Sequence, residues 1–273
     1  MRTSGVLHAT RGLGLHDHIC WPYDDPAEFR RRAVEFLADG LALGQRCWYV
    51  SEGPTEELLS HVAELGAALD SGALRVVSID DTYGDGGAVT PAEQVATYAA
   101  ATRAALADGF SGLRVAAEAT PMVRGDEALD AFCRYEHLVD RYMAGEPFAA
   151  MCAYDRTELP ASAIGQLACL HPASGTGGSP FRLYAVPHAR VALDGELDLE
   201  SRDDFTRALD RADLRAGGGP VVVDGSSLEF IDHHALFALS RAADGDVVLR
   251  TRRSAPARLA ALVGVPGLRV EAE

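Results

Sequence analysis

The sequence predicts an α/β protein, with a large and mainly parallel sheet in its first part and a smaller α/β unit in its second. Three observations predict this: apolar runs alternate with helical patterns, turn residues separate them, and a Gly/Ser/Pro-rich stretch interrupts them. Apolar strands that alternate with helices are typical of parallel sheets covered by helices. We therefore expect a domain at 1–170, a flexible linker at 171–180 and a second domain at 181–273.

The first domain is expected to alternate helices and strands along the chain. Its first helix has a clear start, because Asp25 can cap it and Pro26 suits its first turn. The segment Thr90-Pro91-Ala92-Glu93 has the form of a capping box. Apolar runs predict strands at 47–50, 74–79, 113–117 and 148–154, and periodicity predicts helices at 25–44, 58–65, 90–106, 126–143 and 161–170.

The second domain shows a different order of elements, which begins with two consecutive strands. Apolar runs predict strands at 181–187, 189–193, 221–223 and 247–249. Helical periodicity predicts helices at 201–216, 235–243 and 255–263. This pattern describes a small α/β unit of roughly 90 residues.

The composition excludes several classes of protein. The chain has no lysine, which a P-loop needs for its phosphates and a Schiff base needs for its amine. The formal net charge is −15, so we expect no nucleic-acid binding. No apolar run approaches the ~18 residues that cross a membrane, and the N-terminus has no secretory signal, so we expect a soluble, cytoplasmic protein. Five scattered cysteines fit reduced thiols.

Three segments of the second domain follow one another in a characteristic order: 193–198 (LDGELD), 221–224 (VVVD) and 228–232 (LEFID). Through these segments the domain resembles the STAS domain of bacterial anti-sigma factor antagonists. The resemblance implies docking on an anti-sigma factor or a related regulatory protein. The residues expected to form the docking surface are Asp198, Asp232, His233 and His234.

The STAS resemblance breaks at the position where the family is phosphorylated. Where the family carries one or two hydroxyl residues and a glycine, this chain has His233-His234-Ala235. The usual phosphate switch therefore cannot operate here in its usual form. The two histidines fit a docking surface without phosphorylation, a contact sensitive to pH or metal, or a phosphohistidine, while Ser226 and Ser227 are substitute phosphosites or plain turn residues.

The first domain carries a set of motifs in a fixed order. They are His16-Asp17-His18-Ile19-Cys20-Trp21-Pro22-Tyr23 at the start, then Arg114 with Glu118, then Glu136, and Cys152-Ala153-Tyr154-Asp155 followed by His171-Pro172 at the end. Through these motifs the domain resembles the MEDS sensory domain of methanogen and methylotroph regulators. The resemblance spans roughly 14–172. It implies a module that senses small, hydrocarbon-like compounds, with a fold like the RecA and KaiC nucleotide-binding domains but without their P-loop.

One ligand pocket is expected in the first domain, because Glu118 and Arg114 follow a strand toward the edge where α/β sheets bind ligands. The expected lining residues are His16, His18, Cys20, Tyr23, Arg114, Glu118, Glu136 and Tyr154. Alternatively, Arg114 and Glu118 form an ion pair that ties a strand to a helix.

The function expected from these features is a non-enzymatic regulator that senses a small molecule or partner and docks through its second domain. No cofactor, metal or catalytic residue is assigned. One alternative is a metal or redox sensor that uses His16, His18 and Cys20, which share one face if they lie on a strand. Another is an enzyme with His16, Glu118, Glu136 or Cys20 as reacting groups, although no motif combines nucleophile, base and orienter.

Overall fold

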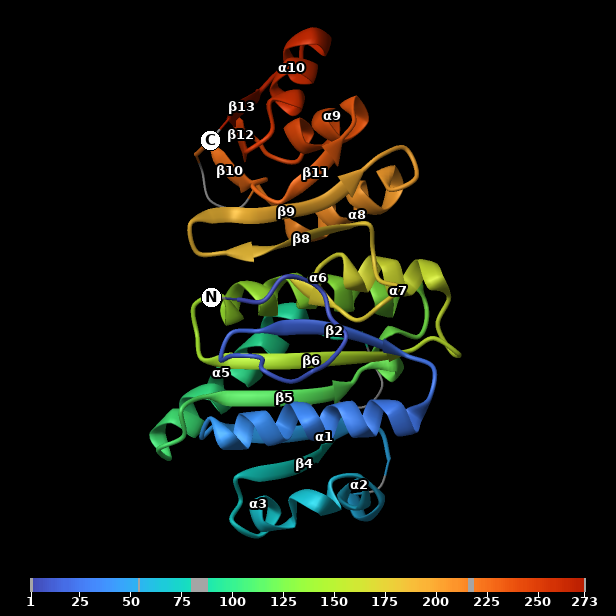
Figure 1. The fold of residues 1–273 in the computed structure, drawn as a ribbon, viewed down its shortest axis with the longest axis vertical. Coiled ribbons are helices and arrows are strands. Elements are labelled where there is room, and N and C mark those ends of the chain that lie inside the picture. The colour runs from blue at the N-terminus through green and yellow to red at the C-terminus, as the bar shows by residue number, and fades with distance from the viewer. Residues whose placement is uncertain (1, 54, 80–87, 216–218, 273) are drawn as a thin grey trace.

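The computed structural model describes residues 2–53, 55–79, 88–215 and 219–272. Two sheets follow one another along the long axis of the molecule (Figure 1). Helices α6 (Asp126–Met143) and α7 (Ala161–Ala168) lie between them. Within the described ranges, no helix is both long and apolar enough to span a membrane.

The first sheet has seven strands in the described residues, and every neighbouring pair is parallel. Their order is β1-β7-β2-β6-β5-β3-β4. The strands are β1 (Gly5–Val6), β2 (His18–Tyr23), β3 (Arg46–Ser51), β4 (Leu74–Ser78), β5 (Leu113–Glu118), β6 (Phe148–Asp155) and β7 (Ala173–Ser174). The expected α/β fold with a large parallel sheet is confirmed.

The helices of the first part begin where local sequence signals place them. Helix α1 (Pro26–Ala42) starts as predicted, because the Asp25 carboxylate accepts a hydrogen bond from the Ala27 N–H at 2.9 Å. Helix α5 (Pro91–Ala107) also starts as predicted, but the Thr90 side chain makes no capping hydrogen bond. The helix expected around 58–65 is divided into α2 (Thr55–His61), η1 (Ala63–Leu65) and α3 (Gly66–Asp70).

The first sheet has a hydrophobic core on each face. Side chains of a strand alternate between the faces, so Val115 of β5 packs with α5 and α6, whereas Ala116 packs under α1. Figure 1 shows α1 in front of the sheet and α5 behind it. This alternation decides which of the predicted site residues can meet.

The second sheet is smaller and mixed. Its parallel strands lie in the order β11-β9-β10-β12-β13, and β8 pairs antiparallel with β9. The strands are β8 (Phe181–Val186), β9 (Ala189–Leu197), β10 (Val221–Asp224), β11 (Leu228–Ile231), β12 (Val247–Thr251) and β13 (Leu268–Ala272), and the helices are α8 (Arg202–Ala212), α9 (His233–Arg241) and α10 (Ser254–Val263). The structure contains every element predicted after residue 180 and adds β11 and β13.

The stretch 171–180, for which the sequence predicts a flexible linker, is ordered over its first half. His171, Ala173 and Ser174 are buried, and β7 pairs with β2 through Ala173 and Ser174. The Gly175 N–H also donates a hydrogen bond to the Cys20 carbonyl at 2.8 Å. The prediction is wrong for 171–175, because pairing with the sheet supplies the hydrogen bonds that a Gly/Ser/Pro composition cannot reveal.

The two sheets share one hydrophobic core through the helices between them. Phe132 of α6, Leu167 of α7 and Phe205 of α8 belong to the same cluster of buried side chains. At the edge of this contact, Arg211 of α8 is 7% exposed and donates to Asp130 of α6 at 3.0 Å. The first part of the chain is therefore packed directly against the second.

Candidate functional site

The residues predicted to line one pocket lie on both faces of the first sheet. Tyr23, Arg114 and Glu118 point to the face under α1. His18, Cys20 and Tyr154 point to the opposite face, where α6 and α7 pack. The prediction of one pocket is therefore wrong, because alternation along β2 and β5 places the sheet itself between the two sets.

Arg114 has a structural role, because its buried side chain links β5 to neighbouring segments. Its side chain is fully buried, and its Nε donates to Gln45 Oε1 at 2.6 Å. Its Nη2 donates to the Leu13 carbonyl at 2.8 Å, and its guanidinium lies 4.4 Å from the ring centre of Phe36. The alternative of an Arg114–Glu118 ion pair is also wrong, because Arg114 bonds to Gln45 and backbone carbonyls, whereas Glu118 accepts from other partners.

Glu118 and Tyr23 form a small polar group at the carboxyl ends of β5 and β2. The Tyr23 hydroxyl donates to Glu118 Oε1 at 3.1 Å, and the Thr120 N–H donates to the same oxygen at 3.1 Å. Burial raises the pKa of Glu118, although the hydrogen bonds from Thr120 and Tyr23 oppose this. The group lies at the sheet edge predicted for ligand binding.

The predicted donor set of His16, His18 and Cys20 is not assembled. Strand β2 begins at His18, so His16 lies before the strand, outside the alternation of its side chains between the two sheet faces. The Nδ1 atom of His16 faces the Glu146 carbonyl at 2.7 Å. Cys20 shares the face of His18 but is buried in the core, where burial raises the pKa of its thiol. These three residues therefore do not converge on one point.

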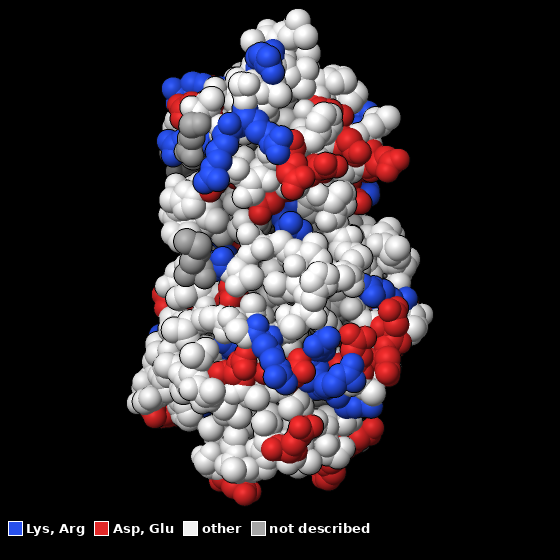
Figure 2. All heavy atoms as spheres, in the orientation of Figure 1, with Lys and Arg blue, Asp and Glu red and all other residues white. Residues whose placement is uncertain are grey.

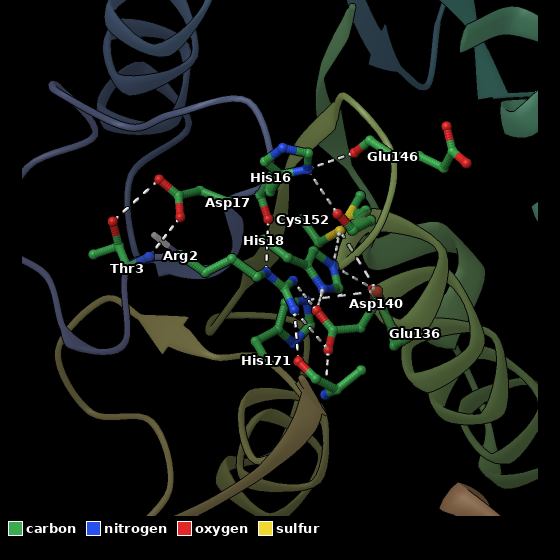
Figure 3. Close-up of polar contacts among 12 residues, drawn as sticks. Arg2, Thr3, His16, Asp17, His18, Glu136, Asp140, Glu146, Cys152 and His171 are labelled. Atoms are coloured by element: carbon green, nitrogen blue, oxygen red, sulfur yellow. Dashed lines mark hydrogen bonds and ion pairs between the residues drawn. The ribbon is translucent and has the colours of Figure 1, made fainter. Parts of the chain in front are cut away.

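A different set of side chains does converge on the α6 face (Figure 3). One donor atom of each member lies within 4.8 Å of those of the others. The members, which we call the His–Glu–Cys cluster, are His18 of β2, Glu136 of α6, Cys152 of β6 and His171, which follows α7. Three of them are 0% exposed and Cys152 is 6% exposed.

The inner atoms of the His–Glu–Cys cluster are closely spaced. Glu136 Oε2 lies 3.1 Å from His18 Nε2 and 3.5 Å from His171 Nε2. Cys152 Sγ lies 3.6 Å from His18 Nε2 and 3.7 Å from Glu136 Oε2. Two nitrogens, one oxygen and one sulfur thus surround a single point that is shielded from solvent.

The outer atoms of these side chains are held by separate partners. His18 Nδ1 lies 3.1 Å from Asp140 Oδ1, one helical turn after Glu136 on α6. His171 Nδ1 lies 2.9 Å from the carbonyl oxygen of Leu167. The Tyr154 hydroxyl donates to Glu136 Oε1 at 2.5 Å. Ring and carboxylate orientations in the cluster are therefore fixed.

Asp140 extends the cluster into the second sheet. The Ala185 N–H of β8 donates to Asp140 Oδ2 at 2.7 Å. Arg2 forms an ion pair with Asp140, and its Nη1 donates to the Ala185 carbonyl at 2.9 Å. One carboxylate therefore contacts β2 through His18 and β8 through Ala185.

The surroundings control the protonation of the cluster. Burial and the neighbouring His18 lower the pKa of His171 to about 4, so its imidazole is neutral near pH 7. Burial alone would lower the pKa of His18, but hydrogen bonds to Asp140 and Glu136 outweigh it and raise this pKa. Burial and the adjacent Glu136 carboxylate raise the pKa of Cys152 well above its usual value.

Half of this cluster is among the residues predicted from the sequence, namely His18 and Glu136, together with the outer partner Tyr154. Cys152, His171 and Asp140 were not predicted as site residues. Cys152 and His171 appear in the motifs of the sensory family, but His171 was also placed at the start of a linker. For Asp140, the available signal was its position four residues after Glu136, which places both carboxylates on one face of α6.

The predicted docking residues lie together at one edge of the second sheet. Leu197 and Ile231 are register partners on parallel strands, so Asp198 and Asp232 follow neighbouring strand ends. Asp232 caps α9, because its Oδ1 accepts from the Ala235 N–H at 2.8 Å. His233 and His234 form the first turn of α9, with ring centres 4.0 Å apart.

His234 also lines a hollow between α8 and α9, together with Arg202, Thr206 and Arg241.

These features define an α/β protein with a buried polar cluster on one face of a parallel sheet. The family model of the methanogen/methylotroph, DcmR sensory domain (MEDS) matches residues 17–172. This match covers more than half of the chain, and the chain belongs to the MEDS family. The match includes all four members of the His–Glu–Cys cluster and identifies the first part as a sensory domain.

The solved structures that are similar over part of the chain include the crystal structure of flagellar accessory protein FlaH from Methanocaldococcus jannaschii. It has a TM-score of 0.36 and 16% sequence identity, and the similarity covers 63% of this chain and 72% of that one. A comparison with curated proteins gave no match. The RecA-like character of the first domain and the STAS character of residues 181–273 stay predictions.

Proposed function

We propose that the chain is a cytoplasmic, non-enzymatic signal-transduction regulator. Its MEDS domain senses a small molecule or partner, and its second unit docks on an anti-sigma factor or a related regulatory protein. The observation that carries this proposal is the double contact of Asp140, which bonds to His18 in the sensory domain and to Ala185 in the second sheet.

This contact supports coupling between the two parts. A carboxylate buried between two sheets responds to any change in its partners, because an unpaired buried charge is costly. A change at His18 would alter the bonds that Asp140 makes with β8. Strand β8 pairs with β9, and β9 leads directly to Asp198 at the predicted docking edge.

The nature of the reactive side chains supports a non-enzymatic role. Burial raises the pKa of Cys20 and of Cys152, which keeps their thiols protonated and unreactive in the absence of a bound cation. Arg114, which a ligand pocket would use, is already occupied by backbone carbonyls and Gln45.

The charge of the molecule supports a protein partner over a nucleic acid. The chain carries 40 acidic residues against 25 basic ones. On the face drawn in Figure 2, basic side chains lie in small groups beside acidic ones, without a continuous basic band. Such a surface lacks the electrostatic footprint of phosphate-backbone binding.

Binding of purified anti-sigma factors from the same genome tests the docking proposal. Asp232→Ala would remove the cap of α9, so Asp232→Asn is the sharper variant, because asparagine also caps helices. We expect the full chain to bind one such factor, and D232N combined with His234→Glu to bind at least tenfold more weakly with an unchanged unfolding midpoint.

The matched control is Asp244→Asn, which removes an exposed acidic charge beyond the other end of α9. This control should bind as the wild type does. Equal binding by the wild type and the D232N/H234E variant, or no binding by either, would contradict the docking proposal.

A further inference from the structure

The inner atoms of the His–Glu–Cys cluster have the composition and arrangement of a metal site. We infer that this cluster is a closed binding site for a divalent transition-metal ion, with Zn²⁺ as the best match. The inference does not depend on the proposed docking function. It rests on donor spacing, on one unpartnered buried nitrogen and on the outer partners of the ligands.

The donor spacing fits tetrahedral coordination. Zn–N and Zn–O bonds of about 2.0–2.1 Å and a Zn–S bond of about 2.3 Å place neighbouring donors about 3.3–3.6 Å apart in a tetrahedron. The four separations given above run from 3.1 to 3.7 Å. The two remaining separations, from His171 Nε2 to His18 Nε2 and to Cys152 Sγ, lie within 4.8 Å. An ion can therefore enter the centre if the four side chains close around it.

His171 supplies the observation that most directly indicates a ligand. Its Nδ1 faces the Leu167 carbonyl, which only accepts hydrogen bonds, so Nδ1 carries the proton. In the neutral ring, Nε2 then presents a lone pair, and this fully buried atom has no hydrogen-bond partner. It faces the Glu136 carboxylate at 3.5 Å, an arrangement that a cation between the two atoms stabilises.

The outer partners are those that metal ligands require. A metal-bound histidine donates its other ring N–H to a carboxylate or a carbonyl, which fixes the tautomer and the ring orientation. His18 has Asp140 in this position, and His171 has the Leu167 carbonyl. The Tyr154 hydroxyl holds Glu136 by Oε1 and leaves Oε2 for the ion.

The donor chemistry selects the kind of ion. A thiolate and a carboxylate together balance the charge of a divalent cation, and a bound cation deprotonates a thiol that burial otherwise keeps neutral. Imidazole and thiolate donors favour Zn²⁺ and related transition metals over Ca²⁺ or Mg²⁺, which prefer oxygen. Four protein ligands close the coordination sphere, which is typical of structural rather than catalytic zinc.

The cysteine that binds the ion can be tested against a matched neighbour. Cys152 and Cys20 are register partners on β6 and β2, and both thiols are buried on the same face. In the full chain produced with Co²⁺ in place of zinc, we expect tetrahedral d–d absorption and a thiolate-to-cobalt charge-transfer band. Cys152→Ser should lose the charge-transfer band, whereas Cys20→Ser should keep it.

Metal content provides a second measurement, which does not depend on a folded variant. Wild-type protein without an affinity tag, produced in zinc-supplemented medium, should carry one zinc ion per chain by elemental analysis. Removal of the ion by a chelator should lower the unfolding midpoint, and Zn²⁺ but not Mg²⁺ should restore it.

Two outcomes would overturn the metal site. One is wild-type protein that stays clearly substoichiometric in metal after production or refolding with Zn²⁺. The other is a charge-transfer band that survives in Cys152→Ser and disappears in Cys20→Ser. Either result would leave the His–Glu–Cys cluster as a metal-free network around His18, and neither would bear on anti-sigma factor binding.

Discussion

The carboxylate of Asp140 and the backbone N–H of Ala185 are joined by a 2.7 Å hydrogen bond that connects helix α6 to the edge strand of the second sheet. Arg2 completes this contact, because it pairs with Asp140 and donates to the Ala185 carbonyl. The sensory domain and the second sheet therefore meet through a fully buried charge, whose pKa is lowered because Arg2 and His18 outweigh the effect of burial.

Asp140→Ala should be strongly destabilising. The change leaves Arg2 and His18 without their carboxylate and the Ala185 N–H without an acceptor, and removing one partner of a buried ion pair costs about 3–5 kcal/mol. Urea unfolding followed by circular dichroism measures this loss. Glu146→Ala changes an exposed side chain nearby and should cost less than about 0.5 kcal/mol. Similar losses in the two variants would contradict the assigned role of Asp140.

Arg211→Ala should weaken the contact between α8 and the helices of the first part. Arg211 donates to Asp130 of α6 at 3.0 Å and to Gln166 of α7 at 2.9 Å, so we expect a loss of about 1–3 kcal/mol in unfolding free energy. The control is Arg207→Ala on the same helix, which breaks only an exposed pair with Asp204 and should cost at most about 0.5 kcal/mol. The prediction fails if R211A is as stable as R207A.

Gly40→Ala should destabilise the protein although alanine favours helices. A Cβ atom at Gly40 would lie 2.8 Å from Arg114 Nε and also against Arg114 Cδ, and four hydrogen bonds hold this arginine in place. We expect a loss of about 1–3 kcal/mol from overpacking. Gly165→Ala in α7 meets nothing within 4 Å and should instead gain about 0.5–1 kcal/mol. Thermal unfolding compares the stability of the two variants. A G40A variant more stable than the wild type would contradict the close packing of Gly40 against Arg114.

The Glu118→Gln variant should gain unfolding free energy relative to the wild type as the pH rises. Because burial raises the pKa of Glu118 in the folded protein, this carboxyl binds its proton more tightly when folded than when unfolded. Its contribution to stability therefore falls as the pH rises from the unfolded pKa through the folded pKa. Glutamine does not ionise and keeps an oxygen that can accept from Tyr23 and Thr120.

The measurement for Glu118→Gln is urea unfolding at several pH values. The stability of the variant relative to the wild type should increase as the pH rises above the unfolded pKa of about 4.3. Glu127→Gln, which changes an exposed carboxylate, is the control. If the difference in unfolding free energy between E118Q and the wild type does not change with pH, burial does not shift the pKa of the Glu118 carboxyl.

The sequence by itself determined the local elements. Helix α6 spans Asp126–Met143, the range that periodicity predicts, and Asp25 caps α1 as expected. These signals succeed because periodicity and caps depend on residues only a few positions apart. His18 and Glu136 were predicted as site residues on other grounds, namely the resemblance to the sensory family.

Only the tertiary structure decided which side chains meet. Strand alternation placed Tyr23, Arg114 and Glu118 on the face opposite His18, although the sequence suggested one pocket. Pairing of β7 with β2 ordered the stretch expected to be a linker and carried His171 into the core. Strand order and helix packing are interactions between residues far apart in the chain, so no local pattern at His18, Cys152 or His171 encodes their convergence on one buried point.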